Sequence, residues 1–203
     1  MSAAAGSESK GRGEAGDTTH LCAADEHGMV VSLTQSIQSV FGAKTASPQA
    51  GFFYNNFLKT CPRGRHPYRL GPQSLPQSNA APTLVLRRVG TSWSPALTLG
   101  AAGSRRLTTA IVQTIDGVIA HGLELPEAVR APRLHALLER GAWVERPLLK
   151  ALGRKNLERA YGPVRALARL SYRAGAAQAI AFRTGGDMLG VADPRRDGSA
   201  EGF

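Results

Sequence analysis

The chain has 203 residues, of which 42% are hydrophobic and 20% are charged, so it has enough apolar residues for one globular domain and is not largely disordered. Its formal net charge is +10, but the arginines are scattered along the chain and aromatic residues make up only 6% of it. Few aromatic side chains are therefore available for the bases of a single-stranded nucleic acid to stack on, and we expect no nucleic-acid partner.

Neither a membrane span nor a disulfide framework is predicted. No apolar run approaches the roughly 20 residues that cross a bilayer, and the residues after Met1 lack the hydrophobic stretch of a signal peptide. This leaves the compartment open. Cys22 and Cys61 are the only cysteines, too few for a zinc site, and we expect two thiols rather than a bridge.

Residues 1–17 are rich in Gly, Ser, Ala and charged residues, which indicates a flexible tail. β-forming residues follow at 19–24 and 29–36, and "DEHG" between them, with Gly28 in the left-handed position, predicts a hairpin. Its first strand starts at the pair Thr18 and Thr19. A third short strand is expected at "GFFYNN", residues 51–56, and the prolines after it predict a long loop.

The remaining elements predict an α+β fold rather than repeating βαβ units. "TLVLRR" and "SPALTLGAAGS" form a second hairpin, and residues 105–121 form a helix with Ser104 as its N-cap. A second helix is expected to start just after "LELPEAV", with Pro126 suited to its first turn. A strand at "AWVERPL", a helix over 147–160 and strands at "QAIAFR" and "MLGVAD" complete the chain.

The threonine pair suggests a chemistry. A threonine hydroxyl is a poor nucleophile unless a base stands beside it, and the residue's own α-amino group is such a base when cleavage makes it an N-terminus. A free α-amine has a pKa of about 7.7 to 8.0 and accepts a proton near neutral pH. Threonine pairs are also common in strands for purely structural reasons.

Six sequence blocks in order carry a specific resemblance: "DTTHLCAADEHGMVVSLTQSI…FG", "GFFYNN", "SNAAPTLVL", "GAAGSRRLTTAI", "APRLH" and "GVADPRRDGSAEGF". From about Asp17 to the C-terminus the chain resembles the small subunit of γ-glutamyltransferases, which are N-terminal-nucleophile hydrolases. The resemblance implies part of an αββα four-layer sandwich that a large subunit completes. It also implies a precursor that cuts itself before a threonine, leaving residues 18–203 as the catalytic domain.

By this resemblance, Thr18 is the self-cleavage point and then the nucleophile, and Ser36 is the second hydroxyl that assists it. Ala102 and Gly103 fall on the glycine pair whose backbone N–H groups form the oxyanion hole. The first glycine is alanine here, and it keeps its backbone donor if Ala102 adopts the required angles. The amine, hydroxyls and amides suffice for acyl transfer, so no cofactor or metal is expected.

The implied substrate pocket departs from the family at most positions. Gln38 stands where the family has asparagine, Phe57 where it has an acidic or amide residue, and Thr60 where an aspartate grips the α-amino group of the substrate. Of the family's serine pair, Ser78 is kept and Asn79 replaces the second serine. The loss of the carboxylate at Thr60 matters most, because charge-assisted hydrogen bonds contribute about 1.5 to 3 kcal/mol.

Two classes of function stay open. One is an amide-cleaving enzyme acting on a small-molecule amide or peptide through an acyl-enzyme on Thr18, with transfer to water or an amine; its acyl group is γ-glutamyl or a related one, or, as an alternative, a different one. The other is a non-catalytic homologue or fragment that acts as an interaction subunit. Only seventeen residues precede Thr18, so the large subunit is expected from the same precursor or from a separate chain. An isolated small subunit would expose a large apolar surface.

Other candidates favour structural interpretations. His20, Cys22 and His27 lie near each other in sequence but lack a fourth metal ligand, and nothing indicates that Cys22 is a reactive thiol. "GAAGS" lacks the pattern of a phosphate-binding loop. The proline-rich loop that follows "GFFYNN" contains Arg63, Arg65 and His66. These side chains either approach an acidic substrate or are charges exposed to solvent.

Overall fold

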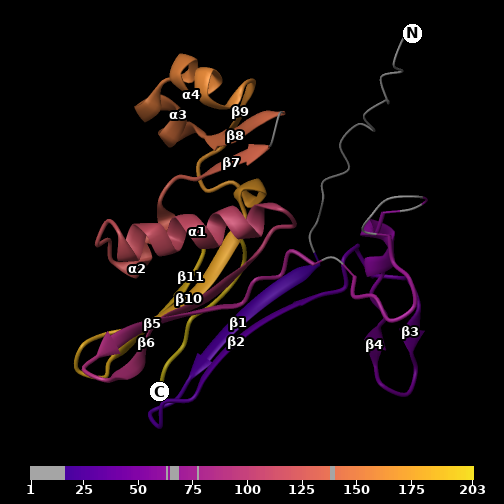
Figure 1. Ribbon diagram of the computed structural model, residues 1–203, viewed down its shortest axis with the longest axis horizontal. Coiled ribbons are helices and arrows are strands. Elements are labelled where there is room, and N and C mark those ends of the chain that lie inside the picture. Colours follow the sequence, from indigo (N-terminus) through magenta and orange to yellow (C-terminus); the bar gives the residue numbers. More distant parts are fainter. Residues whose placement is uncertain (1–16, 63, 65–68, 77, 138–139) are drawn as a thin grey trace.

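The computed structural model describes residues 17–62, 64, 69–76, 78–137 and 140–203. Its centre is a four-stranded antiparallel sheet in the order β11-β10-β6-β5. These strands are β5 (Thr83–Val89), β6 (Ser92–Ala102), β10 (Ala176–Phe182) and β11 (Met188–Ala192). Helices α1 (Arg106–Ile119) and α2 (Leu125–Arg130) cover one face of this sheet, and the hairpin of β1 (Thr18–Ala24) and β2 (Val30–Ser36) lies against the other (Figure 1).

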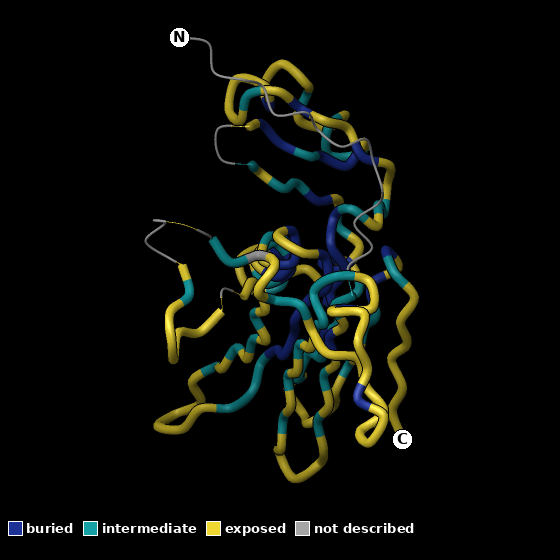
Figure 2. Tube along the Cα trace, turned by 90° about the vertical axis from the view of Figure 1, so that its right-hand side faces the viewer, coloured by how far each residue is buried: buried dark blue, intermediate teal, exposed yellow. Residues whose placement is uncertain are grey.

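The second half of β6, from Leu97 to Ala102, is buried on both faces because the two covering layers meet it from opposite sides. Side chains alternate along a strand, so Leu97, Leu99 and Ala101 face the helices and pack with residues of α1 and α2. Thr98 faces the hairpin instead, where its hydroxyl lies 3.9 Å from the Cys22 sulfur. Figure 2 shows the buried residues gathered in the interior of the molecule and the exposed ones at the tips of its loops. The core therefore lies between α1, α2 and the central sheet.

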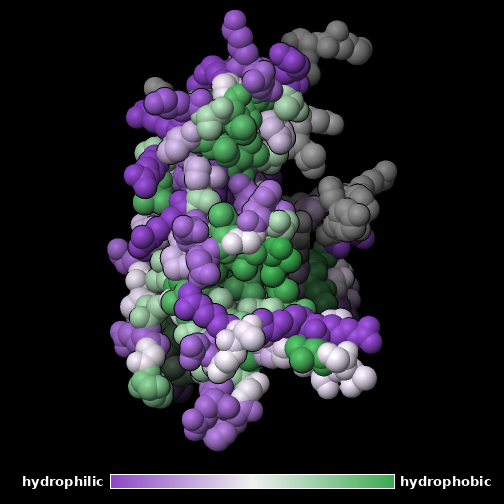
Figure 3. Space-filling view, turned by 90° about the vertical axis from the view of Figure 1, so that its left-hand side faces the viewer, coloured by the Kyte–Doolittle hydropathy of each residue, from purple (hydrophilic) through white to green (hydrophobic). Residues whose placement is uncertain are grey.

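A smaller unit is built beyond α2. It contains β7 (Leu134–Leu137), β8 (Gly141–Glu145) and β9 (Val164–Leu167), with α3 (Arg146–Leu152) and α4 (Arg154–Tyr161) packed on them. Its core is formed by Ala142, Val144, Leu157 and Val164. Seen from the side of α2, apolar side chains gather over the middle of the molecule, with polar side chains above and below them (Figure 3).

Four buried charged residues join this unit to the central sheet. The Arg195 guanidinium pairs with Glu145 at 2.6 Å and with Asp193 at 3.2 Å, and Arg133 pairs with Asp193 at 2.7 Å. Backbone N–H groups of Arg133, Ser171 and Ala177 also donate to these carboxylates. Buried charges are tolerated when they are paired and hydrogen-bonded in this way.

Both predicted hairpins and the helix over 105–121 are confirmed, with small changes at their ends. The predicted third strand shrinks to β4 (Phe52–Phe53), which pairs with β3 (Ala46–Ser47). The proline-rich loop begins after the short 3₁₀ helix η1 (Phe57–Thr60), and a second one, η2 (Tyr172–Ala174), precedes β10. Cys22 and Cys61 are free thiols, as expected.

Several expected boundaries are wrong. Ser104 does not cap α1, because Arg105 occupies the N-cap position with no side-chain cap bond and Ser104 has a φ of 57°. Helix α2 was expected to start after "LELPEAV", but it begins within that segment, at Leu125. The reason is the capping box that Glu124 and Glu127 form there. The expected helix over 147–160 is two helices, since Gly153, with a φ of 77°, separates α3 from α4. Strands β7 and β9 were not predicted.

Candidate active site

Two hydroxyl groups meet at the open end of the first hairpin. Thr18 is the first residue of β1 and Ser36 the last residue of β2, and the antiparallel register places them opposite each other. Thr18 Oγ1 donates a hydrogen bond of 2.9 Å to Ser36 Oγ, which also accepts one of 3.1 Å from the Gln38 backbone N–H. Ser36 thus orients the Thr18 hydroxyl, and the backbone of Gln38 in turn fixes the position of Ser36.

The peptide bond before Thr18 also has a hydrogen-bond donor. The Ile37 backbone N–H donates to the Asp17 carbonyl oxygen at 3.2 Å, which extends the ladder of the hairpin by one step. An N–H group aimed at a carbonyl oxygen stabilises the negative charge that develops there when the carbonyl is attacked. The Asp17 carbonyl and the Thr18 hydroxyl belong to neighbouring residues. The hydroxyl can therefore attack the carbonyl carbon without a nucleophile from a distant part of the chain.

The turn between β6 and α1 contains Ala102 and Gly103, the residues expected to supply oxyanion donors. Gly103 has a φ of 139°, and a Cβ there would lie 2.8 Å from the Gly175 Cα, so glycine is required for two reasons. Ala102 is buried and does not have a positive φ, so the alanine in place of the family's first glycine causes no strain. The departure at Ala102 therefore leaves the backbone of the turn intact.

A small cavity of about 150 Å³ collects most of the predicted site residues. Of the nine, it is lined by six: Thr18, Ser36, Gln38, Phe57, Ser78 and Asn79. Ala102 and Gly103 do not line the cavity themselves but directly precede Ser104, which does. Thr60 ends η1, and its side chain lies outside the described part. Arg63, Arg65 and His66 are also outside the described residues.

The remaining lining residues were missed by sequence reasoning. Ala80, Ser104, Arg105 and Leu107 complete the cavity wall. Arg105 is exposed, and among the described residues it has no ion-pair partner. The available signal is the "GSRR" segment, which places an arginine two residues after Gly103, although neither the predicted helix nor the resemblance gave that arginine a role.

His20 and Cys22 lie on the inner face of β1, away from this cavity. The His20 ring is 5% exposed, with Nδ1 2.8 Å from the Thr34 hydroxyl and Nε2 3.2 Å from the Cys22 sulfur. Burial lowers the pKa of His20 to about 4 and raises the pKa of the Cys22 thiol. A neutral imidazole beside a protonated thiol has a packing role and is not an activated nucleophile pair.

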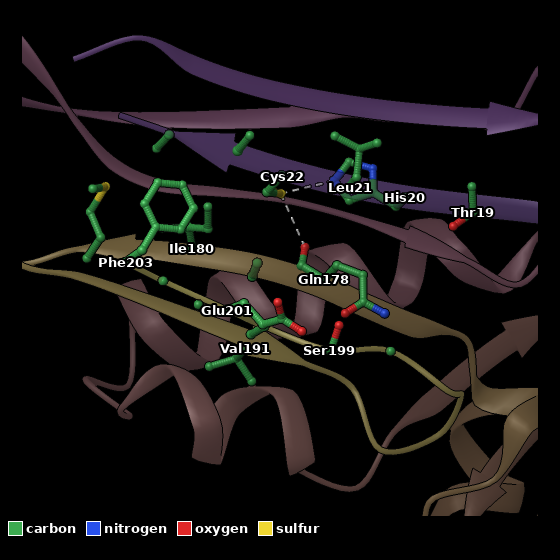
Figure 4. A pocket seen from close by; sticks show the side chains of 18 of the residues that line it. Thr19, His20, Leu21, Cys22, Gln178, Ile180, Val191, Ser199, Glu201 and Phe203 are labelled. Carbon is green, nitrogen blue, oxygen red and sulfur yellow. Dashed lines mark hydrogen bonds between the residues drawn. The ribbon is translucent and has the colours of Figure 1, made fainter. Parts of the chain in front are cut away.

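The same strand borders a larger cavity of about 600 Å³ between β1, β10, β11 and the C-terminal segment. Figure 4 shows Cys22 on one wall, with its sulfur directed at the Gln178 carbonyl oxygen, and Glu201 and Phe203 on the segment opposite. The hydroxyl pair does not line this cavity. In the described ranges no three His, Cys, Asp or Glu side chains lie together so as to hold a metal ion, and no helix is long and apolar enough to cross a membrane.

Comparison with known proteins tests the resemblance. The family model described as gamma-glutamyltranspeptidase matches residues 2–203. The chain belongs to the γ-glutamyltranspeptidase family. The resemblance that the six sequence blocks indicated is thereby confirmed.

Within the γ-glutamyltranspeptidase family, the chain is similar to both acylases and glutathione hydrolases. It is 33% identical to the acylase ACY 1 proenzyme of Pseudomonas sp. (strain SE83) over 193 residues, covering 92% of this chain and 32% of that protein. It is 28% identical to the glutathione hydrolase proenzyme of Escherichia coli (strain K12), covering 90% and 32%. The chain thus spans about a third of the length of these relatives.

The fold agrees with a solved member of the family. The T380A mutant of the Helicobacter pylori gamma-glutamyltranspeptidase superposes with a TM-score of 0.73 and 27% identity, covering 88% of this chain and 100% of that chain. The expected α+β class of the N-terminal-nucleophile hydrolases is therefore confirmed. Of the expected layers, the described residues form the helical layer of α1 and α2, the central sheet and the β1-β2 hairpin that lies on it.

Proposed function

We propose that this member of the γ-glutamyltranspeptidase family is an N-terminal threonine hydrolase or acyltransferase that cleaves a γ-glutamyl or related amide through an acyl-enzyme on Thr18. The observation that carries the proposal is the hydrogen bond between Thr18 and Ser36 at the wall of the small cavity, beside the turn of Ala102 and Gly103. The names of the acylase and glutathione hydrolase relatives support amide cleavage as the reaction class.

Maturation comes first in this mechanism. Thr18 Oγ1 attacks the Asp17 carbonyl carbon, and the Ile37 N–H stabilises the oxyanion. The C–N bond breaks as the Thr18 nitrogen takes up the proton that the hydroxyl has lost, which leaves a free α-amine and an ester between Asp17 and the Thr18 oxygen. Water hydrolyses the ester, releasing the Asp17 carboxylate and restoring the Thr18 hydroxyl. Residues 18–203 then form the mature small subunit.

Substrate cleavage uses the same oxygen. The freed α-amine accepts the Thr18 hydroxyl proton as the oxygen attacks the substrate carbonyl, and Ser36 holds the hydroxyl in place. The backbone N–H groups of Ala102 and Gly103 stabilise the tetrahedral oxyanion. The protonated amine then gives its proton to the leaving nitrogen, and an ester on Thr18 remains. Water or an amine attacks that ester and releases the acyl group.

A large subunit is the partner that this proposal requires. The outer face of the first hairpin presents Leu21, Val31 and Leu33, each between 42% and 44% exposed. The inner face carries the polar residues His20 and Ser32 instead. A hairpin with its outer face in water shows the opposite pattern, with apolar side chains on the inner face and polar ones on the outer face. Apolar side chains on the outer face fit a further layer from the large subunit, which would complete the four-layer sandwich.

The test is replacement of the nucleophile in the product of the complete gene. Thr18→Ala removes the attacking oxygen, so we expect a precursor that stays uncut by intact-mass measurement and amide hydrolysis reduced by at least about 10³-fold. Thr19→Ala is the matched control, because Thr19 lies on the outer face of β1 and makes no hydrogen bond to Ser36. A wild-type chain that remains uncut before Thr18 would refute the enzyme and favour a non-catalytic interaction subunit.

A further inference from the structure

The second asparagine of "GFFYNN" makes contacts that the proposed mechanism does not use. Asn56 occupies the N-cap position of η1 but makes no side-chain cap bond, although asparagine is among the residues that best cap a helix in this way. Its Oδ1 instead accepts a hydrogen bond of 3.0 Å from the backbone N–H of Ser39, 17 residues earlier in the chain. Its own backbone N–H donates to the Ile37 carbonyl oxygen at 3.2 Å. Asn56 is therefore bound to the segment that follows β2.

That segment contains a strained turn. The Ser39 N–H also donates to the Ile37 carbonyl oxygen at 3.2 Å, and Gln38 between them has a φ of 75°. A hydrogen bond across three residues with a central φ of about +75° is the rare and strained form of the γ-turn. Glutamine has a Cβ that opposes a positive φ, so this turn requires contacts that hold it. Strain of this kind persists where the surroundings over-determine the backbone, and it clusters at functional sites.

Two consecutive N–H groups at this turn are directed at the cleavage site. The Ile37 N–H donates to the Asp17 carbonyl oxygen at 3.2 Å, and the Gln38 N–H donates to Ser36 Oγ at 3.1 Å. The first contacts the peptide bond that breaks in the proposed maturation. The second holds the oxygen that accepts the hydrogen bond of the Thr18 hydroxyl at 2.9 Å. Both partners of the proposed attack are therefore held by residues of the turn.

A planar peptide unit links Asn56 to the Ser36 hydroxyl. The Ile37 carbonyl and the Gln38 N–H belong to the same trans peptide unit and point in opposite directions. Asn56 and Ser39 both bind this carbonyl, so they set the orientation of the whole unit. The Gln38 N–H on its other side is thereby directed at Ser36. Without the bond from Ser39 to Asn56 Oδ1, Gln38 is free to relax to a negative φ, and rotation of the unit turns its N–H away from Ser36.

We infer that Asn56 is a positioning residue for self-cleavage: it holds the strained turn at Gln38, and the turn keeps Ser36 in place to orient the Thr18 hydroxyl toward the Asp17 carbonyl. Asn56 is half-buried and is not among the described residues that line the small cavity, so it acts through the turn and not on the reacting atoms. The inference rests on the proposed function for the cleavage and on the hydrogen bonds of the turn for the role of Asn56.

The rate of self-cleavage tests this role. The product of the complete gene is made by cell-free synthesis, and its uncut fraction is followed with time by intact mass. Asn56→Ala removes the acceptor for the Ser39 N–H, so we expect cleavage before Thr18 to slow at least about tenfold. Asn56→Asp keeps an acceptor oxygen and should recover most of the wild-type rate. An unchanged rate in Asn56→Ala, or an equal loss in Asn56→Asp, would overturn the inference.

Asn55→Ala is the matched control for these variants. Asn55 is the exposed neighbour of Asn56, and its Oδ1 accepts the Phe57 backbone N–H at 3.1 Å, within its own segment. We expect this variant to cleave at the wild-type rate. A loss as large as that of Asn56→Ala would show that any change in this segment slows cleavage, which would refute a specific role of Asn56.

A pair of double variants tests the strain. Both carry Asn56→Ala and both lose the Gln38 amide group, but Gln38→Gly also removes the Cβ that opposes a positive φ, whereas Gln38→Ala keeps it. We expect the glycine double variant to cleave at least about fivefold faster than the alanine one, because its turn forms without the hydrogen bond to Asn56. Equal rates would refute the strained turn as the element that Asn56 holds.

Amide hydrogen exchange separates this inference from the proposed reaction. In the complete chain kept uncut by Thr18→Ala, Asn56→Ala should speed exchange of the Gln38 and Ser39 amides relative to that of Leu99, which is buried in the central sheet and reports global unfolding. Faster exchange at the turn, together with a wild-type chain that is never cut, would refute the reaction and leave only the hold of Asn56 on the turn. Cleavage of the wild type with unchanged exchange in the variant would refute the inference while the reaction stands.

Discussion

At the residue scale, the positions of Thr18 and His20 on the first hairpin give these two polar residues different roles. Thr18 and His20 are two residues apart on β1, yet Thr18 reaches the small cavity whereas His20 is buried against the central sheet. The His20 ring occupies the place where a Cβ on Gly100 would lie, so a larger residue at position 100 would collide with it. His20 therefore packs the hairpin onto β6.

The pKa of His20 predicts a dependence of stability on pH. Burial lowers it from 6.5 to about 4. Between these pH values the unfolded chain binds a proton that the folded chain does not, so the stability contributed by neutral His20 is present above pH 6.5 and is lost as the pH falls to about 4. The loss amounts to about 3 kcal/mol, at 1.36 kcal/mol per pKa unit.

Urea denaturation of wild type and His20→Gln between pH 7 and pH 4 measures this contribution. The free energy of unfolding of the variant should fall less over this range than that of the wild type, since glutamine keeps hydrogen-bonding groups but does not titrate. His27→Gln, at an exposed turn position, should follow the wild type. Parallel curves for wild type and His20→Gln would show that the ring does not titrate as described.

At the element scale, the turn from β6 to α1 combines an unusual backbone with a close approach. Gly103 and Gly90 both have positive φ, 139° and 60°, but a Cβ at position 90 has nothing within 4 Å whereas one at position 103 meets the backbone of Gly175. Gly90→Ala should cost about 1 to 2 kcal/mol from the left-handed conformation alone.

Gly103→Ala should therefore cost more than Gly90→Ala in thermal unfolding, because it adds a clash with backbone to the strained φ. It should also lower kcat, because the turn carries the proposed oxyanion donors, whereas Gly90→Ala in the β5-β6 turn should leave kcat unchanged. Equal melting temperatures and equal kcat values for the two variants would contradict this account of the turn.

At the scale of the whole molecule, the buried charges tie the smaller unit to the central sheet. Glu145, at the end of β8, has no exposed surface and accepts hydrogen bonds from the Arg195 guanidinium, while Asp193 follows β11 directly. Removing one partner of a buried pair leaves the other charge unpaired, which costs about 3 to 5 kcal/mol.

Glu145→Gln should accordingly lower the free energy of unfolding by about 3 to 5 kcal/mol in urea denaturation. The control is Glu158→Gln, which breaks the exposed pair of Glu158 with Arg154 and should cost at most about 1 kcal/mol. A loss of similar size in both variants would show that the buried cluster does not hold the two parts together.

Local patterns were enough to predict most of the elements. Alternating β-formers around "DEHG" and the helical spacing of Leu107, Ile111 and Ile115 depend on neighbours in the chain, and both predictions were confirmed. Strand β9 was missed because its partner β8 lies earlier in the chain, on the other side of two helices, and β7 was missed because its four residues are too few to show an alternating pattern. The break at Gly153 was missed because a left-handed glycine inside an otherwise helical pattern leaves little trace in the sequence.

The family, the α+β class and the residues of a proposed threonine nucleophile could be predicted without a structure, because they depend on residue types in a fixed order. The folded chain was needed to show which of those residues share a cavity, that Ala102 fits its turn without strain, and that Arg105 lines the cavity with Thr18 and Ser36. Local patterns do not contain this information, because the cavity wall combines the ends of β1 and β2, the segment around Ser78 and the start of α1, whose proximity depends on packing across the central sheet.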